Sequence, residues 1–321
     1  MTPGIHTKPS LRATLIGAGV MASLMLFHLY LEYQPSLFLL NHDLRGGTRV
    51  IQDPRSPRTL LNESSPARGW LEVEYPAGPI EPLEYTRLPA IKGPNNWTCL
   101  LLHGLGDHQA SDSFRLREAL LTLRPALFEP MSFVIPAADA LPVTVFPGLP
   151  RPAWFDIRNW SDIHRDEDVL HMENNVRRLV HIINLLQLDL SRTIIAGFSQ
   201  GAVMSLLLGL TLDRPPAGVI MLSGFLPMPD QLEAIFSRPI TETGIRRQTI
   251  LHWLHGAEDP YFPLPFAQQG FRRLQKLALF PPHNLFFSHI NRLDHRWSLE
   301  ELGLLANSSL DRFFPTAPSS S

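Results

Sequence analysis

The chain has 321 residues, of which 44% are hydrophobic, and this is enough for one α/β domain with additional segments. Its 30 prolines and 18% charged residues indicate a surface rich in loops rather than a bundle of helices. The formal net charge of −2 provides no basic surface for phosphate groups, which argues against a nucleic-acid partner. The single cysteine, Cys99, excludes both an internal disulfide and a metal site built on cysteines.

The chain begins with an uncharged apolar segment. A short tail, residues 1–12, contains Lys8 and Arg12, and residues 13–31 follow without Lys, Arg, Asp or Glu. These 19 residues approach the roughly 20 that cross a bilayer, so we expect a transmembrane signal-anchor rather than a buried helix or a cleaved signal peptide. Because the basic residues precede the segment, the rest of the chain is expected to be luminal or extracellular; the alternative is cytoplasmic.

Four N-x-S/T sequons are compatible with a luminal chain. The candidate glycosylation sites are Asn62, Asn96, Asn159 and Asn307. Such tripeptides also arise by chance in cytosolic proteins, so the sequons support the luminal orientation without deciding it.

The remainder of the chain divides by composition. Residues 32–94 are rich in Pro, Ser and Arg, which is typical of a stalk or an embellishment packed on a domain. A single domain is expected over residues 95–315, with a disordered tail at 316–321. No internal repeat is visible in the sequence.

Strands and helices alternate through the expected domain. Strands are predicted at the start of 97–107 (WTCLLLHGLGD) and in 131–138, 193–198, 217–226, 248–256 and 283–290. Helices are predicted in 167–188, 201–212, 266–279 and 298–314. This alternation predicts a mostly parallel sheet covered by helices on both faces, with catalytic groups at the carboxyl ends of its strands.

The segment GFSQG, residues 197–201, has the G-x-S-x-G pattern of a nucleophile elbow. The apolar run TIIAGF precedes it and the helical sequence GAVMSLLLGL follows it, so Ser199 is expected on a strand-to-helix turn. A glycine-rich turn that merely contains a serine is the alternative. The strand and helix on either side favour a nucleophilic Ser199, because a serine hydroxyl needs exposure and an adjacent base to react.

An acid and a histidine are expected after the nucleophile, each near the end of a strand. Asp259 follows the apolar strand that ends at Gly256, and we prefer it to its neighbour Glu258. His295 follows the last strand and precedes the last helix, and we prefer it to His289, which lies within that strand.

The oxyanion of the reaction requires two donors that are fixed before the reaction begins. The backbone amide of Gln200, immediately after Ser199, is one candidate. The amide of Leu105, in the loop HGLGD after the first strand, is the other. Gln200 is expected to contribute through its backbone rather than its side chain.

Several segments together resemble the acyl-protein thioesterase and carboxylesterase branch of the α/β-hydrolases, also called the phospholipase/carboxylesterase family. In chain order they are LLLHGLGD (100–107), VIPAADALPVT (134–144), WFDI (154–157), GFSQGAVMSL (197–206), LSGFLP (222–227), HGAEDPYFP (255–263) and a late histidine before an EE pair. The resemblance covers roughly residues 95–315.

The resemblance implies an α/β-hydrolase fold with Ser199, Asp259 and His295 as the catalytic triad and the amides of Leu105 and Gln200 as oxyanion donors. It also implies hydrolysis of long-chain acyl thioesters or esters, such as S-palmitoyl cysteine on proteins or lysophospholipids, with no cofactor or metal. Family members commonly have an acyl channel beside the triad.

In this chain the passage LPVTVFPGLPRPAWF (141–155) looks like the cover of that channel, with Trp154 and Phe155 in it; simple packing on the sheet is the alternative. The sequence departs from the family pattern in two places. Ala202 replaces the usual second glycine after the serine, and HINRLDH stands where an aromatic-Pro-Gly sequence usually precedes the base.

The main hypothesis is therefore a membrane-anchored serine hydrolase that cleaves acyl esters or thioesters through an acyl-enzyme intermediate. A small-molecule carboxylesterase of secondary metabolism is one alternative, and a catalytically silent hydrolase-fold binding protein is another. The expected substrate is an acylated protein, a lipid or a small ester. The other expected partner is a membrane, into which the N-terminal helix inserts.

Overall fold

The computed structural model describes residues 48–50, 80–93, 96–107, 111–212, 214–236 and 249–308. The chain divides into two compact units, residues 1–45 and 46–321, and every described residue belongs to the second. The predicted transmembrane segment 13–31 and the predicted tails 1–12 and 316–321 lie outside the described residues. Within the described ranges, no helix is long and apolar enough to span a bilayer.

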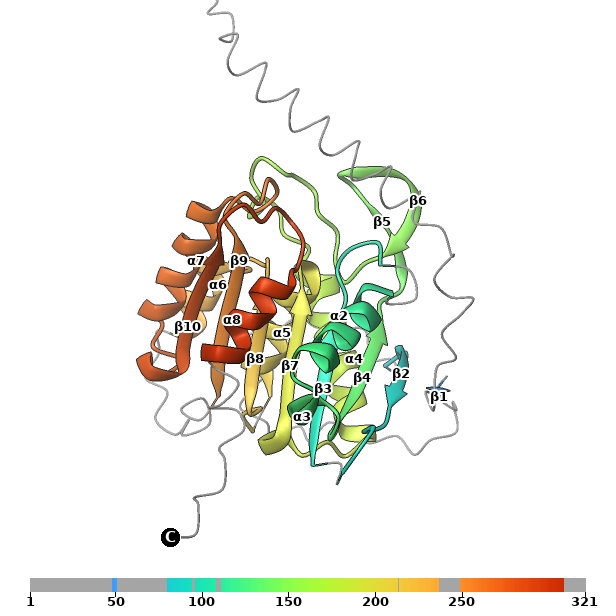
Figure 1. The fold of residues 1–321 in the computed structure, drawn as a ribbon. Helices are drawn as coiled ribbons and strands as arrows, with labels where there is room; N and C mark the ends of the chain where they lie inside the picture. Colours follow the sequence, from blue (N-terminus) through green and yellow to red (C-terminus); the bar gives the residue numbers. More distant parts are fainter. Residues whose placement is uncertain are drawn as a thin grey trace, which may run out of the picture. The chain divides into compact units, whose positions relative to one another are not determined.

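An eight-stranded sheet, in the order β1-β2-β4-β3-β7-β8-β9-β10, forms the centre of the described part of the chain (Figure 1). Its strands are β1 (Thr48–Val50), β2 (Glu84–Leu88), β3 (Trp97–Leu102), β4 (Met131–Ala137), β7 (Thr193–Phe198), β8 (Gly218–Leu222), β9 (Ile250–Gly256) and β10 (Leu285–Ile290). Within this sheet, β4, β3, β7, β8, β9 and β10 all run parallel to one another. At the other edge, β1 pairs antiparallel with β2, and β2 pairs antiparallel with β4. The predicted mostly parallel sheet is confirmed.

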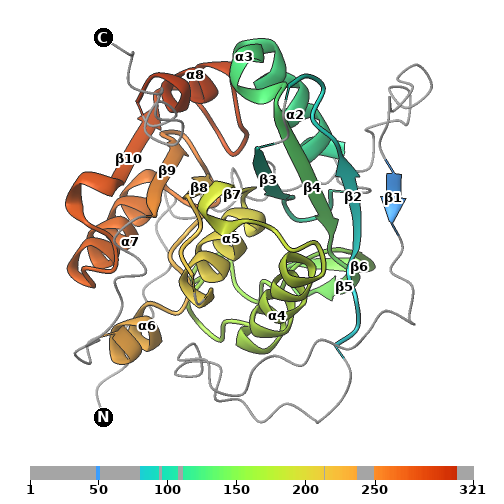
Figure 2. The ribbon, with the colours of Figure 1, turned by 90° about the horizontal axis from the view of Figure 1, so that it is seen from below.

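Helices cover both faces of this sheet, as predicted (Figure 2). They are α2 (Ser111–Leu123), α3 (Pro125–Phe128), α4 (Val169–Leu185), α5 (Gln200–Thr211), α6 (Pro229–Phe236), α7 (Leu264–Lys276) and α8 (Leu299–Ser308). Side chains of α2, α3 and α8 pack on one face, and side chains of α5, α6 and α7 pack on the other. Because the central strands are buried on both faces, their sequences are continuous apolar runs, of which β8 (GVIML) is an example.

The first strands of the sheet lie in the segment 32–94, which was expected to be a stalk or an embellishment packed on the domain. The described fold includes β1 and β2, although the domain was expected to start at residue 95. In β2 only Tyr85 and Leu88 are buried. Because they are three positions apart, this short segment between prolines lacks the alternation that indicates a strand in a sequence.

Two closed loops lie between β4 and α4. A hairpin of β5 (Ala140–Val143) and β6 (Phe146–Pro152) forms the first, and the amide of Ala153 closes its base by donating to Asp139 O at 3.0 Å (Figure 1). Residues 156–168 form the second, which is closed where the Asp156 amide donates to Asp168 Oδ2 at 2.8 Å. We call residues 153–155, which join the two loops, the 153–155 segment.

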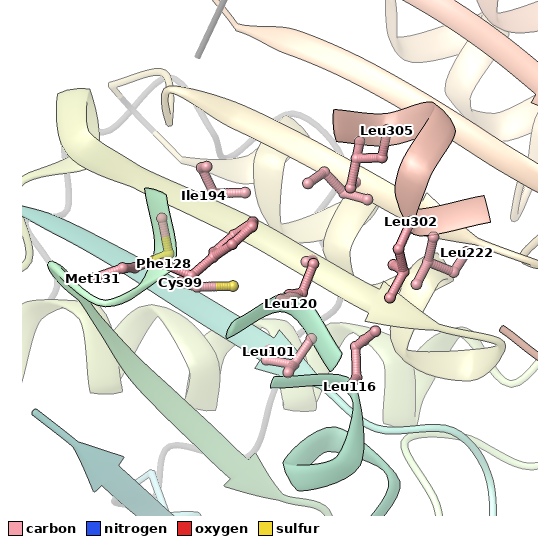
Figure 3. A pocket seen from close by; sticks show the side chains of 12 residues that line it. Cys99, Leu101, Leu116, Leu120, Phe128, Met131, Ile194, Leu222, Leu302 and Leu305 are labelled. Atoms are coloured by element: carbon pink, nitrogen blue, oxygen red, sulfur yellow. The ribbon is translucent and has the colours of Figure 1, made fainter. Parts of the chain in front are cut away.

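The helices α2, α3 and α8 leave a small cavity of about 20 Å³ against the sheet (Figure 3). Its lining is apolar apart from the Cys99 thiol. Burial raises the pKa of this thiol to about 12. Neither Ser199, Asp259 nor His295 lines it, so this cavity is a packing defect within the core rather than the place where a substrate meets those residues.

Candidate active site

Ser199 lies on a sharp turn between β7 and α5, as the sequence indicated. Its backbone has φ 55° and ψ −118°, a conformation that residues with a side chain rarely adopt. The turn closes because glycines flank it: a Cβ on Gly197 would lie 2.2 Å from Gly201 O, and one on Gly201 would lie 2.2 Å from Leu102 O. The Ser199 amide donates to Leu222 O at 2.9 Å, which joins the turn to the end of β8.

A chain of hydrogen bonds connects the Ser199 hydroxyl to a buried carboxylate. His295 Nε2 is 2.8 Å from Ser199 Oγ, and His295 Nδ1 is 2.7 Å from Asp259 Oδ2. An ionised carboxylate only accepts, so Nδ1 carries a proton and the neutral imidazole leaves Nε2 free to accept the proton of the serine. The other carboxylate oxygen, Oδ1, accepts from the amides of Tyr261 and Phe262, both at 2.9 Å.

The environment of Asp259 favours its charged form. Burial raises the pKa of this carboxyl, but its electrostatic interaction and hydrogen bond with His295, together with the Phe262 amide, outweigh burial and hold the pKa below its ordinary value of 3.8. His255 is 3.6 Å from the same carboxylate, and burial lowers the pKa of its imidazole. The His255 ring therefore stays neutral and donates from Nε2 to Phe262 O at 2.6 Å.

The loop that carries His295 packs directly on the end of β9. A Cβ on Gly256 would lie 2.4 Å from Leu293 O and 2.5 Å from Asp294 O, and the Glu258 amide donates to Leu293 O at 2.9 Å. This contact brings His295 to Asp259 although the loop lacks an aromatic-Pro-Gly sequence.

The alternatives considered in the sequence lie elsewhere. The Glu258 side chain is exposed, and His289 is exposed on β10.

The loop after β3 brings a second set of backbone groups to Ser199. Gly104 lies beside the nucleophile, since a Cβ on it would be 3.5 Å from Ser199 Cβ. The Gly106 amide donates to Pro152 O at 2.8 Å, whereas the amides of Leu105 and Gln200 have no acceptor among the described residues. Two free N–H groups beside a serine are the arrangement that an oxyanion requires.

A comparison with known protein families matches residues 84–308 to the phospholipase/carboxylesterase model. The chain belongs to the phospholipase/carboxylesterase family. It is accordingly a serine hydrolase of carboxylic esters or thioesters.

Named relatives include acyl-protein thioesterase 1 of Candida albicans, which is 30% identical over 220 residues, covering 67% of this chain and 92% of the relative. The acyl-protein thioesterase 1 of Mycosarcoma maydis is 32% identical over 229 residues, covering 68% and 91%. The crystal structure of Zea mays acyl-protein thioesterase 2 shares the fold, with a TM-score of 0.54 and 24% identity over 69% of this chain and 95% of that one.

In this member of the family, Trp154 and Phe155 are buried in the protein, with exposed fractions of 0% and 1%. The Gln200 side chain is also fully buried and bonds to their backbone: Oε1 accepts from the Trp154 amide at 3.0 Å, and Nε2 donates to Phe155 O at 2.7 Å. The expectation that Gln200 matters only through its backbone amide is therefore incomplete. Its partners lie 46 and 45 residues earlier, and no local pattern reveals them.

Aromatic rings surround His295 in this family member. The ring centroids of Tyr261, Phe262 and Phe198 lie 5.0, 5.4 and 5.1 Å from that of His295, and Trp160 lies 5.0 Å from Tyr261. Burial, reinforced by the charge of Asp259, raises the pKa of Tyr261 to about 12, so its phenol stays protonated. These rings limit the access of water to the hydrogen bond between His295 and Asp259.

The structure places three of the four sequons. Asn96 is exposed before β3, Asn307 lies in α8, and Asn159 Oδ1 accepts from the amide of Ser161 at 2.9 Å; Asn62 lies outside the described residues.

The described ranges contain no group of three or more His, Cys, Asp or Glu side chains arranged to hold a metal ion.

A second buried carboxyl lies near the first. Glu301 is fully buried in the first turn of α8, and neither of its carboxyl oxygens has a hydrogen-bond partner among the described residues. Burial, reinforced by the charge of Asp259, raises the pKa of Glu301 from 4.5 to about 8. A Glu in an EE pair at the start of a helix is favoured there by the helix dipole and is usually exposed, so no local pattern indicates this burial.

Replacing Glu301 by Gln should make stability less dependent on pH. Below pH 4.5 the wild-type carboxyl is protonated in both the folded and the unfolded chain. From there to about pH 8 only the unfolded chain releases the proton, so the free energy of unfolding falls by roughly 5 kcal/mol across this window. Urea unfolding at pH 5, 7 and 8.5 should show that the advantage of Glu301→Gln over wild type grows with pH.

The exposed neighbour provides the matched control for this measurement. Glu300→Gln should leave the pH dependence of unfolding as it is in the wild type. An advantage of Glu301→Gln that is the same at all three pH values would show that the folded chain holds Glu301 ionised.

Proposed function

We propose that Ser199 is the nucleophile of this hydrolase, His295 its general base and Asp259 the carboxylate that orients the base. The observation that carries the proposal is the continuous hydrogen-bond chain from Ser199 Oγ through His295 to Asp259, with distances of 2.8 and 2.7 Å. The free amides of Leu105 and Gln200 are proposed as the oxyanion donors.

The reaction follows from these positions. Ser199 Oγ attacks the acyl carbonyl carbon while His295 Nε2 takes the hydroxyl proton, and the two amides stabilise the oxyanion of the tetrahedral intermediate. The intermediate collapses to an acyl-enzyme as the thiolate or alkoxide leaves and receives the proton from His295. Water then attacks the acyl-enzyme with His295 again as base, which releases the carboxylic acid and restores Ser199.

Asp259 remains ionised throughout the reaction because its pKa is held below the ordinary value. Its negative charge stabilises the imidazolium that forms twice in each cycle, and its two amide bonds hold the carboxylate in place.

The proposed substrates are long-chain acyl thioesters on proteins, or the related esters of lysophospholipids. Relatives that match this chain over most of their own length are named acyl-protein thioesterases, which favours a thioester substrate. A hydrophobic acyl channel beside Ser199 stays a prediction. Trp154 and Phe155 are too deeply buried to line an open groove in this conformation.

Replacement of any one of the three residues should remove activity. Ser199→Ala should abolish labelling by a fluorophosphonate probe, and His295→Ala and Asp259→Asn should each lower kcat on the order of 10⁴-fold. The measurement is probe labelling together with hydrolysis of a nitrophenyl ester by purified protein.

Matched controls come from residues of the same type outside the hydrogen-bond chain. Ser191→Ala, His289→Ala and Glu258→Gln change exposed side chains and should retain the wild-type rate. Labelling that survives in Ser199→Ala, or a comparable loss in a control variant, would remove the corresponding residue from its proposed role.

The substrate class can be tested by comparing two acyl donors. The value of kcat/KM for an S-palmitoyl peptide should exceed that for nitrophenyl acetate by at least about 10-fold, because a long chain contributes apolar burial that an acetyl group lacks. A preference for the short ester would instead identify a small-molecule carboxylesterase, with the same residues performing the chemistry.

Membrane anchoring through residues 13–31 and a luminal location of the hydrolase domain stay predictions from the sequence. If they hold, glycosidase treatment of the protein from eukaryotic cells should lower its apparent mass by removing glycans from sites such as the exposed Asn96. An unchanged mass would contradict the luminal location.

A further inference from the structure

The 153–155 segment is held at every polar group of Trp154. Its amide donates to Gln200 Oε1 at 3.0 Å, its indole Nε1 donates to His103 O at 2.9 Å, and its carbonyl accepts from Asn175 Nδ2 at 2.7 Å. The indole also lies against the His103 ring, with centroids 5.0 Å apart. One fully buried residue, through its indole and its backbone amide, therefore connects the loop after β3 to the first residue of α5.

On the side of the β3 loop, Trp154 bonds to the backbone of His103 and lies against its ring, and the His103 ring in turn orients a peptide group of the proposed oxyanion hole. His103 Nε2 accepts from the Ala138 amide at 2.9 Å, so the imidazole proton is on Nδ1, which donates to Gly104 O at 2.7 Å. Gly104 O and the Leu105 N–H belong to one planar peptide unit and point in opposite directions. Fixing the carbonyl therefore fixes the direction of the Leu105 donor.

On the side of the nucleophile, the second proposed donor belongs to Gln200. The two hydrogen bonds from the Gln200 side chain to the 153–155 segment restrain the first turn of α5, where the Gln200 N–H is free. The backbones already touch at Gly201 and Leu102, which fixes their separation. That contact does not set the rotation of the peptide groups, and Trp154 adds a restraint on it through its contacts with His103 on one side and Gln200 on the other.

We infer that Trp154 and the Gln200 side chain are positioning residues of the oxyanion hole: they hold the Leu105 and Gln200 amides in the mutual orientation that the tetrahedral intermediate requires. This inference rests on the proposed function of Ser199, Leu105 and Gln200. Neither side chain reaches the reacting atoms, so their effect is on the transition state and not on binding of the ground-state substrate.

The test removes one hydrogen bond and keeps the aromatic ring. Trp154→Phe should lower kcat on the order of tenfold, less than the roughly 100-fold or larger loss when a donor itself is removed, and should leave KM unchanged. The inhibition constant of a long-chain trifluoromethyl ketone, whose hemiketal oxygen occupies the oxyanion hole, should rise by the same factor as kcat falls.

Trp253→Phe is the matched control. Trp253 is equally buried, but its indole N–H has no hydrogen-bond partner among the described residues, so its loss should change neither kcat nor the inhibition constant. Gln200→Met provides an independent variant that breaks the other end of the connection. Because both changes act through one set of bonds, the double variant should lose little more than the more damaging single variant.

The inference is overturned if Trp154→Phe lowers only thermal stability while kcat and the inhibition constant stay at wild-type values. It is equally overturned if KM rises and the inhibition constant does not, since Trp154 would then act on substrate binding. Failure of the proposed function has a different signature: the wild-type enzyme would retain its probe labelling and its rate after Ser199→Ala.

Discussion

The backbone of Ser199 is held at φ 55°, and this turn sets the positions of both its hydroxyl and the Gln200 amide that follows it. Such a conformation costs of order 1–3 kcal/mol and persists only where its surroundings enforce it. Here the glycine contacts between β7, α5 and β3 enforce it, and α5 is buried along its entire length. The same contacts bring the β3 loop to Ser199, so the conformation that presents the hydroxyl also sets the place of the proposed oxyanion donors.

Two carboxyl groups, those of Asp259 and Glu301, are buried near one another, and their pKa values are shifted in opposite directions. Asp259 has an imidazole and two amides as partners, and these keep it ionised in spite of burial. Glu301 has none within the described residues, and its carboxyl stays protonated up to about pH 8. At neutral pH Asp259 is therefore charged and Glu301 is neutral, and burial of Glu301 lowers the free energy of unfolding above pH 4.5.

Local sequence patterns predicted those parts of the fold that local physics determines. Continuous apolar runs marked the parallel strands, and the turn at GFSQG with Asp259 and His295 at later strand ends indicated the constellation that the structure brings together. The β5–β6 hairpin was not predicted because its prolines suppress the strand signal. The contacts of the Gln200 and Glu301 side chains depend on packing between distant segments, which no local pattern encodes.

The two loops on either side of the 153–155 segment are each closed at the base by a hydrogen bond, so a change of sequence within a loop need not move this segment. The hairpin between Asp139 and Ala153 and the loop between Asp156 and Asp168 each return to the point from which they leave. Each can therefore accept insertions, deletions or an exchanged sequence without moving the three residues between them. The sequences of both loops can thus change to suit a different acyl or leaving group, while Trp154 keeps its hydrogen bonds to His103, Asn175 and Gln200.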